Sequence, residues 1–274
     1  KVVVNDLGGN IDGSGGDVSP AQSVVDEIKA MGGEAVANGD DISSWEGSQR
    51  LINTAVETFG DINIVVNNAG ILRDRMLTNM TEEEWDAVIK VHLKGTFGPS
   101  RWAAAYWREQ AKAGKPTSGR IINTTSVSGI YGNLGQTNYG AAKAGIASFT
   151  IIAALELARF NVTVNAVAPV ALTRMTEGLG NAPETDEERE MRSPRWIAPI
   201  VTWLASDEAA GVTGRIFEAS GQTLAIAEGW HRGPSHAPVE DPTTLGPIVA
   251  ELLKNARPNA GMDGRDGSWP QSAR

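Results

Sequence analysis

The sequence predicts an α/β fold in which helices cover both faces of a doubly wound parallel sheet. From residue 1 to about residue 220, short runs rich in β-branched residues alternate with longer helical segments. Several of these runs are apolar throughout, which is typical of strands buried on both faces of a parallel sheet. The expected strands cover 1–5, 34–38, 62–67, 120–124, 162–167 and 214–218.

Capping residues mark several helix boundaries between these strands. Ser19 precedes Pro20, a residue that favours the first position of a helix. Thr81 is followed three residues later by Glu84, which predicts a capping box. Gly60 follows its helix where a left-handed residue is favoured. Two long helices are expected over 81–113 and 136–159.

The composition changes after about residue 228, and this divides the chain into two regions. Residues 1–227 are expected to form one domain, and residues 228–274 a Pro/Gly-rich C-terminal extension. Six of the 13 prolines lie from Pro234 onward, and only 247–256 has a helical pattern.

Charge and composition exclude several classes of function. A net charge of −9 argues against a nucleic-acid surface, which needs a basic stripe. The absence of cysteine removes disulfides and thiolate chemistry and suits a reducing cytoplasm. Three histidines make a metal cage improbable, so no metal site is expected. No uninterrupted apolar run of about 18 residues occurs, so no membrane helix is predicted.

The chain opens on "VVVND", an apolar run that ends at Asp6. In dinucleotide-binding folds the second strand ends in an acid that binds the adenosine ribose. The "GSGG" at 13–16 follows this acid and does not open directly into a helix, so it does not replace the usual phosphate loop. The alternative is an edge strand of an unrelated α/β protein.

Polar residues also follow the third expected strand. "NIVVNNAG" (63–70) places Asn67 and Asn68 at its end, and Gly70 allows a close approach of another group. This pattern fits either a cofactor groove or a polar turn.

The segment "RIINTTSVSGIYGNLGQTNYGAAKAG" (120–145) carries the strongest chemical signal. Tyr139 and Lys143 are four residues apart, so they share one helix face. A nearby ammonium is expected to lower the pKa of the phenol, which is otherwise a weak base at neutral pH. Ser126, at the end of the preceding strand, could hydrogen-bond the same substrate oxygen. A bare Tyr-x-x-x-Lys is weak evidence, but the order strand, Ser, loop, Tyr, Lys is specific.

A further strand breaks at Pro169 within "NVTVNAVAPVALTRMT" (161–176). Its loop is expected at the carboxyl edge of the sheet, where ligands bind in such folds.

These motifs resemble those of the short-chain dehydrogenase/reductase family, which has a Rossmann-type sheet, from Lys1 to about Gly221. Within it, "VVVNDLGG", "NNAGILRDRM", "VHLKGTF" and "SGIYGNLGQTNYGAAKAG" resemble the (3R)-hydroxyacyl-CoA dehydrogenase units of peroxisomal multifunctional enzymes and their bacterial relatives.

The resemblance implies a role for each matching residue. Tyr139 would be the general acid/base, Lys143 would hold the nicotinamide ribose and tune Tyr139, and Ser126 would position the substrate oxygen. The implied cofactor-binding residues are Tyr139 and Lys143 together with Asp6, Asp41, Ile42, Asn68, Ala69, Gly70, Leu172 and Thr173.

The chain also departs from the family pattern. His92 occupies the fourth catalytic position of the family, which is usually asparagine. The multifunctional-enzyme branch resembles this chain in that substitution. The alternative is a histidine inside a helix whose hydrogen bonds are satisfied there and which has no catalytic role. Pro169-Val170 replaces the usual Pro-Gly, and "GQTLA" follows "EAS" where a double glycine is usual.

The family sheet has the order 3-2-1-4-5-6-7, which would place a missing strand between 1–5 and 62–67. We therefore expect the domain to lack its first βα unit and its parent to carry about 30 more residues in front. The chain as given is then expected to bind NAD poorly or not at all.

The expected function is hydride transfer between NAD and a secondary alcohol or ketone, of the 3-hydroxyacyl-CoA type. Asp6 favours NAD over NADP, because a 2′-phosphate would meet its carboxylate. The alternatives are a non-catalytic dinucleotide-binding regulator and a dehydrogenase of a steroid-like alcohol. The family also implies a homodimer or homotetramer formed through the two long helices, although their apolar faces could instead cover their own sheet.

Overall fold

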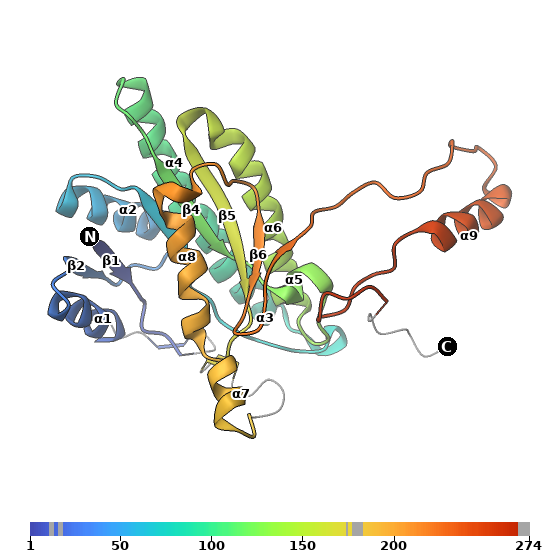
Figure 1. Cartoon of the computed structure of the whole chain (residues 1–274), viewed down its shortest axis with the longest axis horizontal. Coiled ribbons are helices and arrows are strands. Elements are labelled where there is room, and N and C mark those ends of the chain that lie inside the picture. Colours follow the sequence, from blue (N-terminus) through green and yellow to red (C-terminus); the bar gives the residue numbers. More distant parts are fainter. Residues whose placement is uncertain (11–13, 16–18, 174, 177–182, 268–274) are drawn as a thin grey trace. The chain divides into compact units, whose positions relative to one another are not determined.

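The computed structural model describes residues 1–10, 14–15, 19–173, 175–176 and 183–267. The chain divides into two compact units, Lys1–Ala227 and Glu228–Arg274 (Figure 1). The functional residues expected from the sequence all lie in the first unit. The absence of a first βα unit stays a prediction.

The larger sheet of the first unit has five strands in the order β3-β4-β5-β6-β7. Its first four strands are parallel, and β7 runs antiparallel to β6. The bounds are β3 (Ile64–Asn67), β4 (Gly119–Thr124), β5 (Val162–Pro169), β6 (Ile216–Ala219) and β7 (Leu224–Ala227). The parallel α/β class predicted from the sequence is confirmed, whereas β7 was not predicted.

A second sheet pairs β1 (Val2–Asn5) with β2 (Ala35–Asn38) in parallel. Within the described residues, β1 and β3 share no hydrogen-bonded pairing, so the six expected strands form two sheets. Val3 nevertheless packs against the same core cluster as β3 and β4. On β3, Ile64 and Val66 are 44% and 47% exposed, while Val65 between them is 7% exposed.

Adjacent residues of β4 show that helices cover both faces of the sheet. Ile121 belongs to a core cluster with α4 (Gly95–Lys112) and α6 (Thr137–Leu157), whereas Ile122 packs with α8 (Ala198–Ala205). Successive side chains of a strand point to opposite faces, so α8 and the pair α4 and α6 lie on opposite sides (Figure 1). The remaining helices of this unit are α1 (Ser19–Ala30), α2 (Trp45–Phe59), α3 (Glu82–Ile89), α5 (Val127–Tyr131) and α7 (Asp186–Met191).

The predicted caps that the structure describes are present. The Thr81 hydroxyl accepts from the Glu84 backbone while the Glu84 carboxylate accepts from the Thr81 backbone, which completes the capping box of α3. Gly60 ends α2 with a φ of 84°, a conformation that glycine adopts without strain. The helix predicted after Ser19 begins at that residue, whose side chain lies outside the described part.

The long helix expected over 81–113 is divided into three pieces. Between α3 and α4 lies a π-helical segment, Lys90–Lys94. Single turns of π-helix of this kind often occur at functional sites. The segment contains His92, whose buried ring makes contacts described below.

Buried amides join β3 and β4 to the helices behind them. The Asn67 Nδ2 donates to Ser100 Oγ at 2.9 Å and to Asn123 Oδ1 at 2.8 Å. The Asn123 Nδ2 in turn donates to Thr150 Oγ1 at 2.9 Å. Because an unsatisfied buried polar group costs about 1–3 kcal/mol, this network fixes β3 and β4 against α4 and α6.

The helix α6 is a long, apolar core element. Length and composition alone would allow Thr137–Phe160 to cross a membrane, although the sequence shows no uninterrupted apolar run. Soluble core helices pass the same test. Its buried residues, among them Lys143, Ile146 and Ala154, place one face of it inside this unit.

The second unit contains one longer helix, α9 (Leu245–Asn255), close to the expected range 247–256. It is preceded by a short 3₁₀ turn at Pro242–Thr244. Arg257 pairs with Asp266 at 2.9 Å and with Glu228 at 3.6 Å, which closes this unit on itself.

Candidate active site

The carboxyl ends of the parallel strands bring the predicted site residues to one edge of the sheet. Asn68 follows β3, Thr124 ends β4 and Pro169 ends β5. The Asn68 Oδ1 accepts a hydrogen bond from Thr124 Oγ1 at 3.1 Å, which joins two of these ends directly.

Ser126 lies just beyond β4, at the start of the short helix α5. Its Oγ accepts from the Ser128 backbone N–H at 3.1 Å, so it also serves as the N-cap of that helix. Gly129 then allows α5 to approach α6 closely, because a Cβ there would lie 2.7 Å from the Cβ of Lys143. The sequence "SVSG" therefore places the Ser126 hydroxyl beside the helix that carries Tyr139.

Lys143 is buried, with 3% of its surface exposed, and is held to the end of β4. Its Nζ donates to the Thr124 carbonyl at 2.7 Å. Its own carbonyl accepts from the Thr125 hydroxyl at 2.7 Å. The Nζ lies 5.5 Å from the centre of the Tyr139 ring, and the Ser126 hydroxyl hydrogen-bonds the phenol. The structure thus brings Ser126, Tyr139 and Lys143 together.

The protonation of Tyr139 differs from the prediction. Burial raises the pKa of the phenol, the Ser126 hydrogen bond lowers it, the Asp74 charge raises it, and the net direction is upward. The expected lowering by Lys143 is wrong for this structure. Burial lowers the pKa of Lys143 itself to about 7, and its ammonium donates to a backbone carbonyl.

His92 lies inside the site as a buried, neutral ring. Its centroid is 5.1 Å from that of Tyr139, edge to face. Burial, helped by the Lys143 charge, lowers the pKa of His92 to about 3. The Nε2 lies 2.8 Å from the carbonyl oxygen and 3.1 Å from the nitrogen of Ile71. The Nδ1 is buried and has no hydrogen-bond partner among the described residues.

Gly70 is required by the position of this histidine. A Cβ on Gly70 would lie 2.3 Å from His92 Cε1, so no larger residue fits without moving the ring. The neighbouring Asn68 and Ala69 are exposed at the edge of the sheet. The "NNAG" segment therefore has a polar, accessible part and a part that packs on His92.

Three other residues implied by the resemblance follow the carboxyl ends of β1 and β5. The exposed Asp6 follows β1, and its Oδ1 accepts from the Gly8 N–H at 2.6 Å. The Leu172 N–H donates to the Arg192 carbonyl at 2.6 Å, so it is already engaged. The Thr173 N–H donates to Thr176 Oγ1 at 2.8 Å, and residues 174 and 177–182 lie outside the described part.

Asp41 and Ile42 are part of a packed turn before α2. The Asp41 Oδ1 accepts from both the N–H and the hydroxyl of Ser43. Burial alone would raise the pKa of Asp41, but these bonds and the nearby Lys90 and Lys94 lower it overall. Ile42 packs against Gly95, where a Cβ would lie 2.6 Å from its Cδ1.

The chemistry of these groups fits a nicotinamide dinucleotide. The exposed Asp6 carboxylate can accept hydrogen bonds from ribose hydroxyls, and the exposed Asn68 amide can line the cofactor groove. The Tyr139 phenol, the Ser126 hydroxyl and the Lys143 amine are suited to the nicotinamide end, where the reaction occurs. The unpartnered Nδ1 of His92 adds a buried polar atom at that end. The expectation that 13–16 does not replace a phosphate loop stays a prediction, since Gly13 and Gly16 lie outside the described residues.

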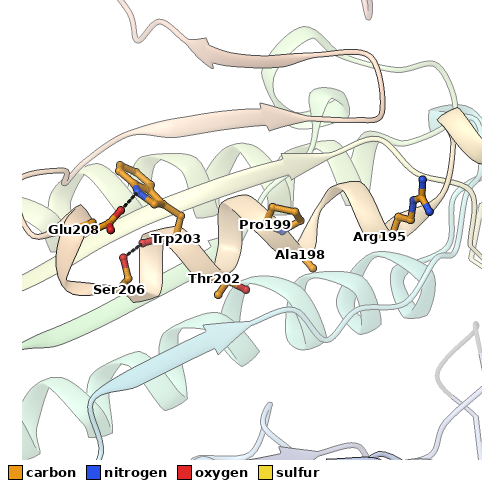
Figure 2. A pocket seen from close by; sticks show the side chains of 7 residues that line it. All are labelled: Arg195, Ala198, Pro199, Thr202, Trp203, Ser206 and Glu208. Atoms are coloured by element: carbon orange, nitrogen blue, oxygen red, sulfur yellow. Dashed lines mark hydrogen bonds between the residues drawn. The ribbon is translucent and has the colours of Figure 1, made fainter.

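A cavity of about 550 Å³ lies elsewhere, on the outer side of α8 (Figure 2). Two of its polar contacts are internal: Trp203 Nε1 donates to Glu208 at 3.2 Å and Ser206 Oγ donates to the Trp203 carbonyl at 2.7 Å. It contains none of the predicted site residues, so we place the active site at the sheet edge on chemical grounds.

Sequence reasoning did not identify Asp74 and Gln136 as part of the site. Asp74 lies in the loop after β3 and accepts from Gln136 Nε2 at 2.7 Å. Its charge acts on Tyr139. The bond between Asp74 and Gln136 joins residues 62 positions apart, so no local pattern could have shown it.

The fold and the site define a doubly wound α/β protein with a serine, a tyrosine and a lysine at its ligand-binding edge. The family described as short chain dehydrogenase matches residues 11–184. The chain belongs to this family, whose dehydrogenases use nicotinamide dinucleotide cofactors.

Comparison with individual proteins gives the same family. A crystal structure of a short chain dehydrogenase from Mycobacterium avium has a TM-score of 0.84 and 52% identity, over 95% of this chain and 88% of that one. Hydroxyacyl-CoA dehydrogenase ChsB1 of Mycobacterium tuberculosis is 41% identical over 97% of this chain and 84% of its own length. The peroxisomal hydratase-dehydrogenase-epimerase of Neurospora crassa is 43% identical over 85% of this chain, which spans 24% of that protein.

The buried Lys143 amine predicts how the free energy of unfolding changes with pH. Lys143 keeps its proton to about pH 10.4 in the unfolded chain but only to about pH 7 in the folded protein. Its contribution to the free energy of unfolding therefore rises as the pH increases through this window. In Lys143→Met, the rise in the free energy of unfolding between about pH 7 and about pH 9 should be smaller by about 2 kcal/mol.

Urea unfolding at several pH values measures this difference. Lys112→Met is the control, because Lys112 is an exposed residue of α4 paired with Glu109. It should follow the wild-type pH dependence. The same dependence in Lys143→Met as in the wild type would contradict the lowered pKa.

Proposed function

We propose that this protein catalyses hydride transfer between NAD and a secondary alcohol of the 3-hydroxyacyl-CoA type. The observation that carries the proposal is the convergence of the Ser126 hydroxyl, the Tyr139 phenol and the buried Lys143 amine. The names of the M. tuberculosis and N. crassa relatives support the substrate class.

Tyr139 transfers the proton. During oxidation the phenolate takes the proton of the substrate hydroxyl, and during reduction the phenol returns it to the carbonyl oxygen. The nicotinamide, when bound, accepts or supplies the hydride. The Ser126 hydroxyl lies beside the phenol and donates to the same substrate oxygen, which fixes that oxygen for the transfer.

Lys143 and His92 support this transfer from the interior. With a pKa of about 7, the Lys143 amine changes protonation near neutral pH and can pass a proton between the site and its surroundings. Lys143 would also hold the nicotinamide ribose. The neutral His92, with a buried Nδ1 beside the Tyr139 ring, offers a further proton-relay position.

The carboxylate of Asp6 supports NAD rather than NADP. It lies exposed at the end of β1, where it would repel a 2′-phosphate and accept from ribose hydroxyls. Asp41, Ile42, Asn68, Ala69, Gly70, Leu172 and Thr173 would complete the cofactor groove. The absence of cysteine supports a cytoplasmic location, and the acidic surface supports a small-molecule substrate rather than nucleic acid.

The first test removes the phenolic hydroxyl in the full-length protein. Tyr139→Phe should lower NADH formation from a (3R)-3-hydroxyacyl-CoA by about 10²–10⁴-fold, because the general base is lost. Binding of NAD, measured by calorimetry, should be kept. Tyr106→Phe is the matched control, since Tyr106 lies on α4 and bonds Asp61 in the loop before β3. Wild-type turnover in Tyr139→Phe would contradict the role of Tyr139, and a wild type that binds NAD without turnover would favour a non-catalytic regulator.

A substrate and cofactor panel tests the finer assignment. (3R)-3-Hydroxyacyl-CoA esters with NAD should exceed free hydroxysteroids in kcat/KM by at least about tenfold. Asp6→Ser should lower the preference for NAD over NADP by about tenfold or more, because the carboxylate is removed. Faster turnover of steroids would reassign the substrate, and an unchanged cofactor ratio would remove Asp6 from the ribose site.

We also propose that the protein is a homodimer or homotetramer joined through α4 and α6. Both helices expose apolar residues, and Leu155 is 77% exposed. Phe97, Ile151 and Ile152 are exposed as well, and a cleft of about 280 Å³ lies between the two helices. A second copy would cover these side chains and remove apolar surface from water.

Sedimentation velocity tests the assembly. The wild type should sediment above the 29.0 kDa of one chain, and Leu155→Glu should shift it toward the monomer. Met31→Glu changes an equally exposed apolar residue outside these helices and should leave the state unchanged. A monomeric wild type would contradict the proposal.

A further inference from the structure

Asp74 connects the loop after β3 to the start of the catalytic helix. Its Oδ2 accepts from Gln136 Nε2 at 2.7 Å. Gln136 is 5% exposed and immediately precedes α6, three residues before Tyr139. The Gln136 Oε1 accepts in turn from Asn133 at 3.0 Å, so the amide is satisfied on both sides.

Backbone contacts strengthen the same connection. The Arg75 N–H donates to the Gly135 carbonyl at 2.7 Å. The Asn138 Nδ2 donates to the Arg73 carbonyl at 2.9 Å, while its Oδ1 accepts from the Tyr139 N–H at 2.7 Å. The loop that carries Asp74 therefore fixes the first turn of α6, and with it the position of Tyr139.

The second oxygen of Asp74 is not needed for this connection. Oδ1 is buried and has no hydrogen-bond partner among the described residues. Burial raises the pKa of Asp74, and the Gln136 bond only partly offsets it. Burying an uncompensated carboxylate oxygen is costly, and an asparagine could accept from Gln136 equally well. When ionised, the Asp74 carboxylate therefore adds a charge near Tyr139 that a neutral tether would not supply.

Among the described residues, Asp74 is the negative charge that acts on the Tyr139 phenol. Ser126 is neutral, His92 is neutral because of its low pKa, and Lys143 is a cation or neutral amine. Near Asp74, the Arg75 guanidinium is engaged by Glu84 at 2.7 Å, and the charge of Arg73 also acts on Glu84.

We propose that Asp74 is a positioning residue for Tyr139, which fixes the start of α6 through Gln136 and sets the electrostatic environment of the phenol with the charge of its carboxylate. The proposal rests on the proposed dehydrogenase function for its catalytic consequence. The negative charge keeps Tyr139 protonated to higher pH, so Asp74 determines the pH at which the site changes from proton donor to proton acceptor.

The direct test is a ¹³C NMR titration of the ring Cζ atoms, because the chain contains three tyrosines. Asp74→Asn keeps an acceptor for Gln136 and removes the charge. The pKa of Tyr139, assigned with Tyr139→Phe, should fall by about 0.5 or more. Tyr106 should be unchanged in this variant.

Asp61→Asn is the matched control. Asp61 is the carboxylate that accepts from Tyr106 and raises its pKa. This control should lower the pKa of Tyr106 and leave that of Tyr139 unchanged. A Tyr139 pKa in Asp74→Asn equal to that of the wild type would overturn the proposal.

A second variant separates the effect of the Asp74 charge from that of its hydrogen bond to Gln136. It can be tested even if Asp74→Asn does not fold. Gln136→Leu removes the hydrogen bond and keeps the carboxylate, so the pKa of Tyr139 should not fall, while kcat should decrease through loss of positioning. A lowered Tyr139 pKa in Gln136→Leu would overturn the electrostatic assignment.

The activity profile provides the second readout. In Asp74→Asn the pH at which kcat/KM for alcohol oxidation rises should move to lower pH by the same amount as the Tyr139 pKa, since oxidation needs the phenolate. If no alcohol is oxidised by the wild type, the proposed function fails, while the NMR titration still decides the role of Asp74. A Tyr139 pKa that falls without any movement of the rate profile would overturn the catalytic part.

Discussion

The site depends on how Lys143 is buried between α6 and the end of β4. Its ammonium is held by the Thr124 carbonyl and its backbone carbonyl by the Thr125 hydroxyl, so helix and strand are joined at both ends of one residue. Since Tyr139 lies one turn earlier on α6, this junction sets the distance from the phenol to Ser126. Burial also lowers the pKa of Lys143 to about 7, which makes the amine responsive near neutral pH. The same contact therefore fixes the geometry and sets the proton chemistry.

Buried polar groups hold the strands and helices of the site in this arrangement. The chain of amides and hydroxyls from Ser100 through Asn67 and Asn123 to Thr150 aligns the ends of β3 and β4. Gly70 and Gly129 then allow two close approaches, one to His92 and one to Lys143. Because these amides and hydroxyls are buried and neither glycine position has room for a Cβ, a change at any of them would move the reacting side chains as well as lower stability.

Local patterns in the sequence predicted most of the fold and the core of the site. The apolar runs located six strands, and the order of Ser126, Tyr139 and Lys143 indicated that they would meet, as they do. The short antiparallel β7 escaped prediction because four residues at a sheet edge leave little pattern. The helix expected over 81–113 is interrupted where His92 turns to Ile71, a contact between distant residues. The direction of the Tyr139 pKa shift was also wrong, since it depends on burial and on Asp74, which spacing on one helix does not show.

The proposed function requires that a hydride leaves the hydroxyl-bearing carbon of the substrate and that a proton leaves its oxygen, both at this site. The most direct measurement uses a (3R)-3-hydroxyacyl-CoA that carries deuterium on C3, with NAD, followed by mass spectrometry of the reduced cofactor. The account predicts NADH that is heavier by one deuterium in every turnover. Unlabelled NADH, or deuterium released to water, would contradict it.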